Sequence, residues 1–194
     1  MQKIAAAQLM SLEQYARERP ALRAGMIEYR RSRQLRVGEH CSWSFEDRRT
    51  VQYQVQEMLR SERIFESDAI AEELATYNPL IPDGSNLKAT LMIEYEDPAE
   101  RARRLMELRG FERHCWMRVA GFEPVYAIAD EDLVRENDSK TSAVHFLRFE
   151  FSAAMIAAAS NAGALGAGVD HPSYRHAVEP LPEGLRRALL ADFV

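Results

Sequence analysis

The sequence predicts an α+β fold, a single domain in which helices cover a mostly antiparallel sheet of about five or six strands. Three observations predict this class. The chain has 194 residues, close to the length of one ordinary domain. Its hydrophobic fraction of 46% and charged fraction of 28% are typical of a globular protein. Segments of alternating polar and apolar residues follow one another directly or after one helical segment, without the strict alternation of a parallel α/β sheet.

The chain is predicted to begin with helices and then to enter its first strand. Ser11 starts an S-x-x-Q capping box, and Pro20 fits the first turn of a second helix. Polar and apolar side chains alternate over 37–45, which predicts a strand. Asp47 follows as an N-cap, so the next helix is predicted over 48–65.

The predicted 48–65 helix has a patterned face on each side. Apolar residues recur along one face, with Glu62 near its centre, while Tyr53, Glu57 and Arg60 share the opposite face. A helix with two such faces is expected to lie between two layers. A carboxylate among apolar groups has to be paired, protonated or metal-bound, because an isolated buried charge is too costly.

Shorter elements follow to the end of the chain. Caps, stop signals and apolar stripes predict helices over 67–77, 97–110, 152–163 and 182–194. Alternation and turn residues predict strands over 87–95, 114–119, 125–129, 142–151 and 164–169. The whole chain, 1–194, is expected to form the one domain, with 1–10 and 176–194 at its periphery.

Charge and composition exclude several classes of protein. The formal net charge of −5 argues against a nucleic-acid binder and against a polybasic membrane-surface module. The long stretch over 153–169 is too weakly apolar to cross a membrane, and the N-terminus lacks the features of a signal peptide. Cys41 and Cys115 form no metal or redox motif and are expected to be reduced core thiols. We therefore expect a cytoplasmic protein.

A metal site would have to be assembled by folding, because no pair of histidines has the spacing of a ligand motif. His145 lies on a predicted central strand, and His171 follows the last predicted strand beside Asp170. Glu57 and Glu62 add carboxylates from the two-faced helix. Such mixed ligands suit the transition metals Zn, Fe or Mn. For each histidine, a plain core or surface role is the alternative.

Anion binding is a second candidate chemistry. Lys88 and Lys140 stay lysine in a chain in which 22 of the 25 basic residues are arginine, which is compatible with a need for a compact ammonium; a GC-rich genome and chance are the alternative explanation. Together with Arg60 and Arg148 they form the candidate anion-binding set, where the two-faced helix is expected to cross the sheet. A purely structural network of ion pairs is the alternative.

Several strings together resemble a bacterial family of unknown function, over about positions 9–175. They are FEDR (45–48), QVQEMLR (54–60), YNPLIPDG (77–84), NLKAT (86–90), KTSAVHFLRF (140–149) and DHP (170–172). Members of this family are often encoded beside rubrerythrin-like proteins and iron–sulfur oxidoreductases. The resemblance therefore implies a cytosolic redox or peroxide-defence partner, and it implies no catalytic residue.

Two functions follow as hypotheses. The first is a non-catalytic accessory or binding protein that serves a rubrerythrin-like or iron–sulfur partner and is a candidate homodimer. The alternative is a small metal-dependent enzyme with a histidine and carboxylate site between the 48–65 helix and the sheet. No motif decides whether the chain is an enzyme.

Overall fold

The computed structural model describes residues 2–129, 131, 140–161 and 163–193. Within these residues, nine strands pair antiparallel in two sheets. The strands are Gln34–Arg36 (β1), Cys41–Glu46 (β2), Asn86–Ile93 (β3), Cys115–Val119 (β4), Val125–Tyr126 (β5), Ile128–Ala129 (β6), Val144–Glu150 (β7), Leu165–His171 (β8) and Tyr174–Val178 (β9). The five-stranded sheet has the order β1-β2-β3-β7-β6, and the four-stranded sheet has the order β5-β4-β8-β9.

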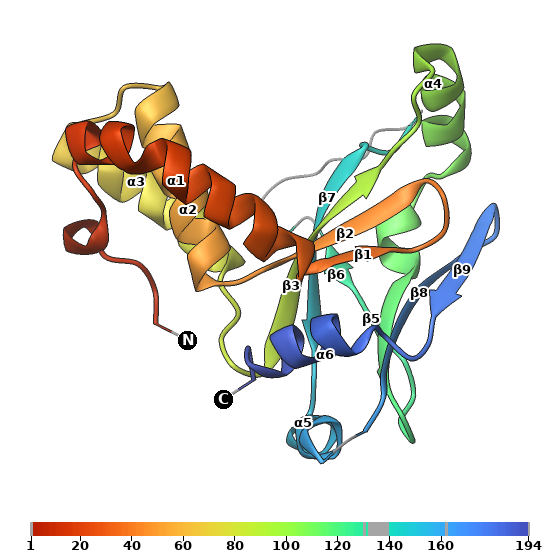
Figure 1. Ribbon diagram of the computed structural model, residues 1–194. Coiled ribbons are helices and arrows are strands. Elements are labelled where there is room, and N and C mark those ends of the chain that lie inside the picture. The colour runs from red at the N-terminus through yellow and green to blue at the C-terminus, as the bar shows by residue number, and fades with distance from the viewer. Residues whose placement is uncertain (1, 130, 132–139, 162, 194) are drawn as a thin grey trace.

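The first three α-helices lie together on one side of the sheets (Figure 1). The α-helices are Leu12–Arg31 (α1), Arg48–Ser61 (α2), Ser67–Tyr77 (α3), Pro98–Glu107 (α4), Ala153–Ser160 (α5) and Glu183–Leu190 (α6). Short 3-10 helices span Ala6–Gln8 (η1), Asn78–Leu80 (η2) and Phe111–His114 (η3). Among these helices of the described chain, none combines the length and apolar character that a membrane crossing requires.

The α+β class and the antiparallel pairing are confirmed, but the strands divide between two sheets instead of forming one. Strand β4 pairs with β8 and not with the five-stranded sheet. Gly168 lies opposite Trp116 in this pairing, and a Cβ on Gly168 would come within 2.5 Å of the Trp116 ring. The large side chain of β4 therefore needs a glycine partner. The alternation of polar and apolar residues along one strand does not show which strand pairs with it. The sequence pattern therefore could not predict that the strands form two sheets.

One hydrophobic core lies between the two sheets. Trp43 of β2 stacks on Phe149 of β7 with ring centroids 5.4 Å apart. Met117 of β4 and Leu165 of β8 reach the same core from the other sheet, and all four side chains are fully buried. Each such burial contributes about 1.5–3 kcal/mol, so this core joins the sheets into one body.

A second apolar cluster holds the helices together. Val51, Val55 and Leu59 on one face of α2 pack with Leu74 of α3 and with Ile4 near the N-terminus. The opposite face of α2 turns toward α1. The two-faced pattern thus correctly indicates a helix between two neighbours, but those neighbours are helices. The expectation that this helix crosses the sheet is wrong, because its apolar face is covered by α3.

The helix predicted over 48–65 ends early, at Ser61. Arg63 has a left-handed backbone with φ of 56°. The Ile64 N–H donates to the Leu59 carbonyl at 2.9 Å, which is the bond that defines a Schellman end. Glycine usually occupies the left-handed position of this motif, so the arginine concealed the stop from sequence analysis.

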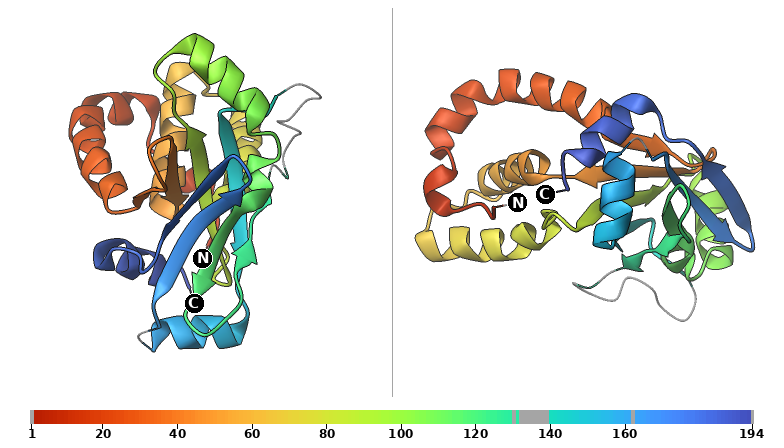
Figure 2. Two further views of the ribbon diagram at one scale, coloured as in Figure 1. Left: turned by 90° about the vertical axis from the view of Figure 1, so that its right-hand side faces the viewer. Right: turned by 90° about the horizontal axis from the view of Figure 1, so that it is seen from below.

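Pro20 lies inside α1 and does not begin a second helix. The Ser11 cap is confirmed, because its hydroxyl accepts from the Gln14 N–H at 3.2 Å. A proline inside a helix removes one backbone hydrogen bond and bends the helix, but it does not always end it. Figure 2 shows α1 arching over α2.

The two end segments, 1–10 and 176–194, contribute to the cores. Ile4 is buried against α2 and α3, and Leu185 and Leu189 of α6 are buried in the core between the sheets. Their side chains therefore stabilise the fold, although both segments were expected at the periphery.

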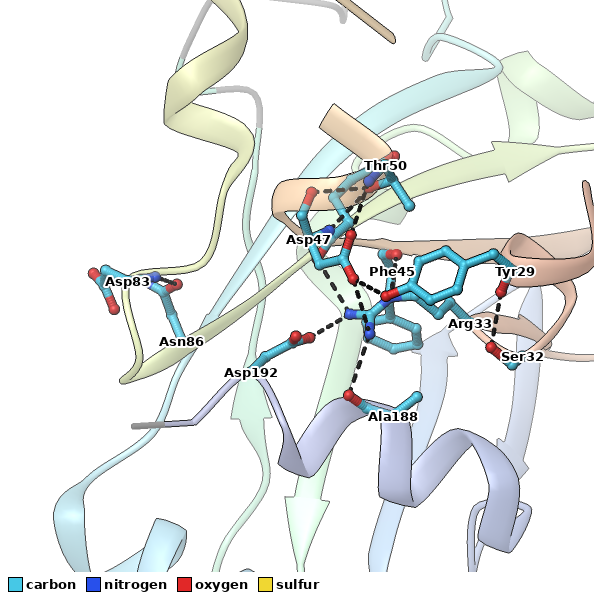
Figure 3. Close-up of polar contacts among 11 residues, drawn as sticks. Tyr29, Ser32, Arg33, Phe45, Asp47, Thr50, Asp83, Asn86, Ala188 and Asp192 are labelled. Carbon is cyan, nitrogen blue, oxygen red and sulfur yellow. Dashed lines mark hydrogen bonds and ion pairs between the residues drawn. The ribbon is translucent and has the colours of Figure 1, made fainter. Parts of the chain in front are cut away.

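A buried guanidinium joins α6 to the start of the five-stranded sheet (Figure 3). Arg33, which is 3% exposed, follows α1 and forms ion pairs with Asp192 and, at 3.5 Å, with Asp47. It also donates to the carbonyl oxygens of Phe45 at 3.1 Å and Ala188 at 3.2 Å. We call Arg33, Asp47 and Asp192 the arginine junction.

Asp47 connects this junction to two helices. Its carboxylate accepts from the Thr50 N–H at 2.8 Å and so caps α2, as the sequence predicts. The same carboxylate accepts from the Tyr29 hydroxyl of α1. One side chain therefore fixes the end of α1 and the beginning of α2 relative to each other.

The arginine junction makes stability depend on pH. Burial raises the pKa of Asp192 from 3.8 to about 6, although Arg33 lowers it. Between these values the unfolded chain binds fewer protons than the folded one, so the free energy of unfolding falls as the pH rises. Relative to Asp192→Asn, the parent is expected to lose about 2 kcal/mol from pH 4 to pH 6. Urea unfolding of both proteins measures this, and a difference that is flat with pH would contradict it.

Candidate functional site

The carboxylates predicted on α2 do not meet the predicted histidines. Glu57 accepts from the Tyr15 hydroxyl at 2.6 Å and pairs with Arg19 at 2.8 Å, both in α1. The Arg19 hydrogen bond holds the pKa of Glu57 below its usual value. Glu62 and Arg60 are exposed at the end of α2. Glu57 therefore fastens α1 to α2, and the three residues share no site.

His145 is fully buried in β7 beside another acid. Its Nε2 lies 2.9 Å from the Thr141 hydroxyl, 3.0 Å from the Ser142 carbonyl oxygen and 3.9 Å from a Glu112 carboxylate oxygen. Glu112 belongs to η3 and is 3% exposed. These contacts give the buried His145 ring polar partners inside the core. This is the plain core role that the sequence analysis gives as the alternative to metal binding.

Asp170 and His171 are the last two residues of β8, the strand that contacts η3. Asp170 accepts from the Tyr126 hydroxyl at 2.6 Å and lies 3.0 Å from His114 Nδ1. Burial lowers the pKa of His171, whose Nε2 faces the Arg109 carbonyl at 3.1 Å. His171 Nδ1 accepts a backbone N–H, so both ring nitrogens are occupied. His114 and Tyr126 escaped the sequence analysis because only the pairing of β8, β4 and β5 brings them to Asp170.

The described residues contain no group of three or more His, Cys, Asp or Glu side chains placed to hold a metal ion. Both cysteines are unpaired and buried, as predicted. Burial raises the pKa of Cys41 to about 12 and raises that of Cys115 well above its usual value. Both thiols therefore stay protonated and shielded at neutral pH, which makes them poor nucleophiles.

Strand register gathers polar and apolar side chains on the outer face of the five-stranded sheet. Residues directly opposite each other in antiparallel strands share a face. Three cross-strand rows result, running from β2 through β3 to β7. These rows are Glu46, Lys88, Arg148 and, in β6, Ile128; Ser44, Thr90 and Phe146; and Ser42, Met92 and Val144.

A cavity of about 630 Å³ opens on this face, and we call it the outer-face groove. The end of α3, η2 and strands β3, β6 and β7 surround it. Its lining is Glu46, Ala75, Thr76, Tyr77, Pro79, Leu80, Lys88, Ala89, Ile128, Glu131, Phe146, Leu147 and Arg148. A second hollow of about 280 Å³ shares Glu46, Tyr77, Leu80 and Phe146 with it, so the two hollows are adjacent.

The predicted anion-binding set contributes two residues to the outer-face groove. Arg148 is bound by both oxygens of Glu131 at 2.7 Å and also by Glu150, so its charge is already balanced. Lys88 donates to the Pro79 carbonyl oxygen. In the described chain no carboxylate forms an ion pair with the Lys88 ammonium. Lys140 is exposed and does not line the groove.

Among the described residues, Lys88 is thus the cation of the groove that forms no direct ion pair, whereas Arg148 forms two. It is half-buried, and burial is the main cause that lowers its pKa. Its cross-strand neighbour Glu46 accepts from the hydroxyls of Thr50 at 2.6 Å and Thr90 at 2.8 Å. The Glu46 carboxylate is thus bound by two hydroxyls. Asp83, Glu131 and Glu150 act on the Lys88 ammonium electrostatically without forming a direct ion pair.

Apolar side chains extend the groove along the sheet. Ile128 is 42% exposed and Val144 is 38% exposed, and half-buried Met92 and Phe146 lie between them in the rows. Large apolar side chains clustered at a surface often mark an interaction site. The outer face therefore combines an apolar strip with Lys88, which forms no direct ion pair among the described residues.

These features define a two-sheet α+β protein whose two thiols and two of whose histidines, His145 and His171, are buried, and whose outer sheet face carries the groove. The chain belongs to the family described as "Protein of unknown function (DUF3501)", whose model matches residues 3–193. It is similar to a protein of unknown function from Burkholderia pseudomallei with a known crystal structure, at 43% identity over 100% of both chains and with a TM-score of 0.91. No curated protein matches the chain.

The shifted pKa of Lys88 can be measured directly, because the chain has only three lysines. After reductive ¹³C-methylation, each lysine gives its own NMR signal, and Lys3 is an exposed internal standard. We expect Lys88 to titrate at lower pH than Lys3, because burial disfavours its charged form. Lys88→Gln assigns the signal. A titration midpoint at or above that of Lys3 would show that the groove does not desolvate this ammonium.

Proposed function

We propose that this protein is a non-catalytic accessory protein that binds a partner protein at the outer-face groove. The observation that carries the proposal is the half-buried Lys88 ammonium beside an exposed apolar strip. Asp83, Glu131 and Glu150 act on this ammonium electrostatically, but among the described residues no carboxylate forms a direct ion pair with it. Interfaces commonly combine an apolar centre with a few charged groups that fix the register.

The groove indicates the chemistry of the partner segment. An apolar side chain fits the cavity of about 630 Å³ over Phe146 and Leu80. A neighbouring aspartate or glutamate of the partner pairs with Lys88. Burial has already removed part of the water from this ammonium, so less desolvation remains to oppose the new ion pair.

The resemblance of the sequence supports a redox or peroxide-defence partner, either a rubrerythrin-like or an iron–sulfur protein in the cytoplasm. The inert thiols Cys41 and Cys115 favour an arrangement in which the partner carries the electrons. No observation favours the alternative metal-dependent enzyme, since His171 has both ring nitrogens occupied and Glu57 is bound to Arg19.

Calorimetric titration with the purified rubrerythrin-like and iron–sulfur proteins of the source organism tests the proposal. We expect one of them to bind, and Lys88→Gln to weaken binding by about tenfold or more, a loss of about 1.4 kcal/mol. Lys88→Met, which keeps the aliphatic stem, should lose as much. Lys3→Gln is the matched control and should bind like the parent.

Three outcomes would refute the proposal. One is that neither candidate binds. Another is binding that Lys88→Gln and Lys88→Met leave unchanged. The third is a homodimer, detected by sedimentation, that Lys88→Gln dissociates, because a second copy of the chain would then occupy the face.

A further inference from the structure

Helix α1 is attached to α2 by polar contacts near its start and near its end. Near its start, Tyr15 and Arg19 both bind Glu57 of α2. Near its end, Tyr29 binds Asp47 at the beginning of α2. Both attachments are polar and directional, so they help to set the separation of the two helices.

A cavity of about 890 Å³ lies between these attachments, and we call it the α1–α2 groove. Its walls carry the apolar groups of Leu22 and Met26 from α1, Tyr53 from α2 and Met10 before α1. Of the 20 residues of α1, only Tyr15 and Met26 are buried. The helix therefore turns apolar groups toward a hollow that no described side chain fills.

The small residues of α1 widen this hollow. Gly25 lines the groove, and a Cβ added at Gly25 would meet no atom within 4 Å. The arch of α1, with Pro20 inside the helix, is visible in Figure 2. The space between the two attachments is therefore set by the backbone of α1.

Three guanidiniums line the same groove. Arg48 donates to two glutamine side chains, and Arg49 lies over the Tyr29 ring at 4.2 Å. In the described residues neither of them, nor Arg17, forms an ion pair with a carboxylate. The acidic residues Asp47 and Glu18 also line the groove. Asp47 pairs with Arg33 in the arginine junction, so Glu18 is the remaining negative charge of the lining.

We propose that the α1–α2 groove binds an amphipathic organic anion, an extended apolar body such as an acyl chain that ends in a carboxylate or phosphate. The volume lies within the range of about 300–1,000 Å³ that is usual for small-molecule sites. The apolar walls suit the chain, and Arg48 and Arg49 suit the anionic head. This site shares no lining residue with the outer-face groove, so it is independent of the proposed partner site.

Titration calorimetry with three probes of equal chain length tests this site. Dodecanoate and dodecyl phosphate carry the two anionic heads, and dodecyltrimethylammonium carries a cationic one. We expect the anions to bind and the cation to bind at least about tenfold more weakly. The stronger of the two anions distinguishes a fatty acid from a phosphate-bearing lipid as the source. Equal affinity for the anionic and cationic probes would overturn the proposal.

Variants locate the binding. Gly25→Leu is expected to fill the groove and abolish binding while favouring the helix, so its melting temperature should not fall. Gly184→Leu is the control, because Gly184 is also helical and a Cβ added there would meet open space, but it lies in α6.

The Arg48→Gln, Arg49→Gln double variant should bind the anionic probes at least about tenfold more weakly than the parent protein. The control double variant Arg103→Gln, Arg187→Gln, at two exposed arginines, should bind like the parent. Unchanged binding by folded Gly25→Leu would refute the site.

Discussion

The buried Arg33 guanidinium is the interaction on which the relation between the helices and the sheets depends. The Arg33 side chain is only 3% exposed to solvent. It pairs with Asp47 and Asp192 and donates to backbone carbonyl oxygens. Removing one partner of a buried ion pair costs about 3–5 kcal/mol, since an uncompensated charge is left behind. Burial is the main cause that raises the pKa of Asp192, and the nearby Asp47 carboxylate raises it further against the opposing effect of Arg33.

Both candidate sites follow from the arrangement that this junction maintains. Asp47 begins α2 and holds Tyr29 of α1, so it closes one end of the α1–α2 groove. The same α2 packs on α3, whose end and η2 overhang the outer face of the five-stranded sheet. Polar attachments thus fasten α1 to α2, and apolar packing fixes α3. The protein gains two hollows with different walls, one rich in arginine and one with a half-buried lysine.

Local signals made much of the fold predictable. Each of four predicted N-caps accepts a hydrogen bond from the backbone N–H three residues later. These caps are Ser11, Asp47, Asp97 and Ser152. Alternation located the long strands, and the rarity of lysine singled out Lys88. The features that the sequence does not predict depend on contacts between segments far apart in the chain, or on a residue type that is unusual at its position. The Schellman end at Arg63 lacks the usual glycine, and Glu57 found Arg19 only because α1 folds back on α2. The sequence analysis grouped His145 and His171 by residue type, but strand pairing places His145 in the five-stranded sheet and His171 in the four-stranded sheet.

Hydrogen exchange measured by mass spectrometry on Arg33→Lys tests the central claim most directly. Lysine keeps the charge but lacks the planar fork that reaches two carboxylates and two carbonyls. The account predicts faster exchange in α6, in the last turns of α1 and in the first turn of α2, with protection of β2, β3 and β7 retained. Protection of α1 and α6 equal to that of the parent protein would contradict it.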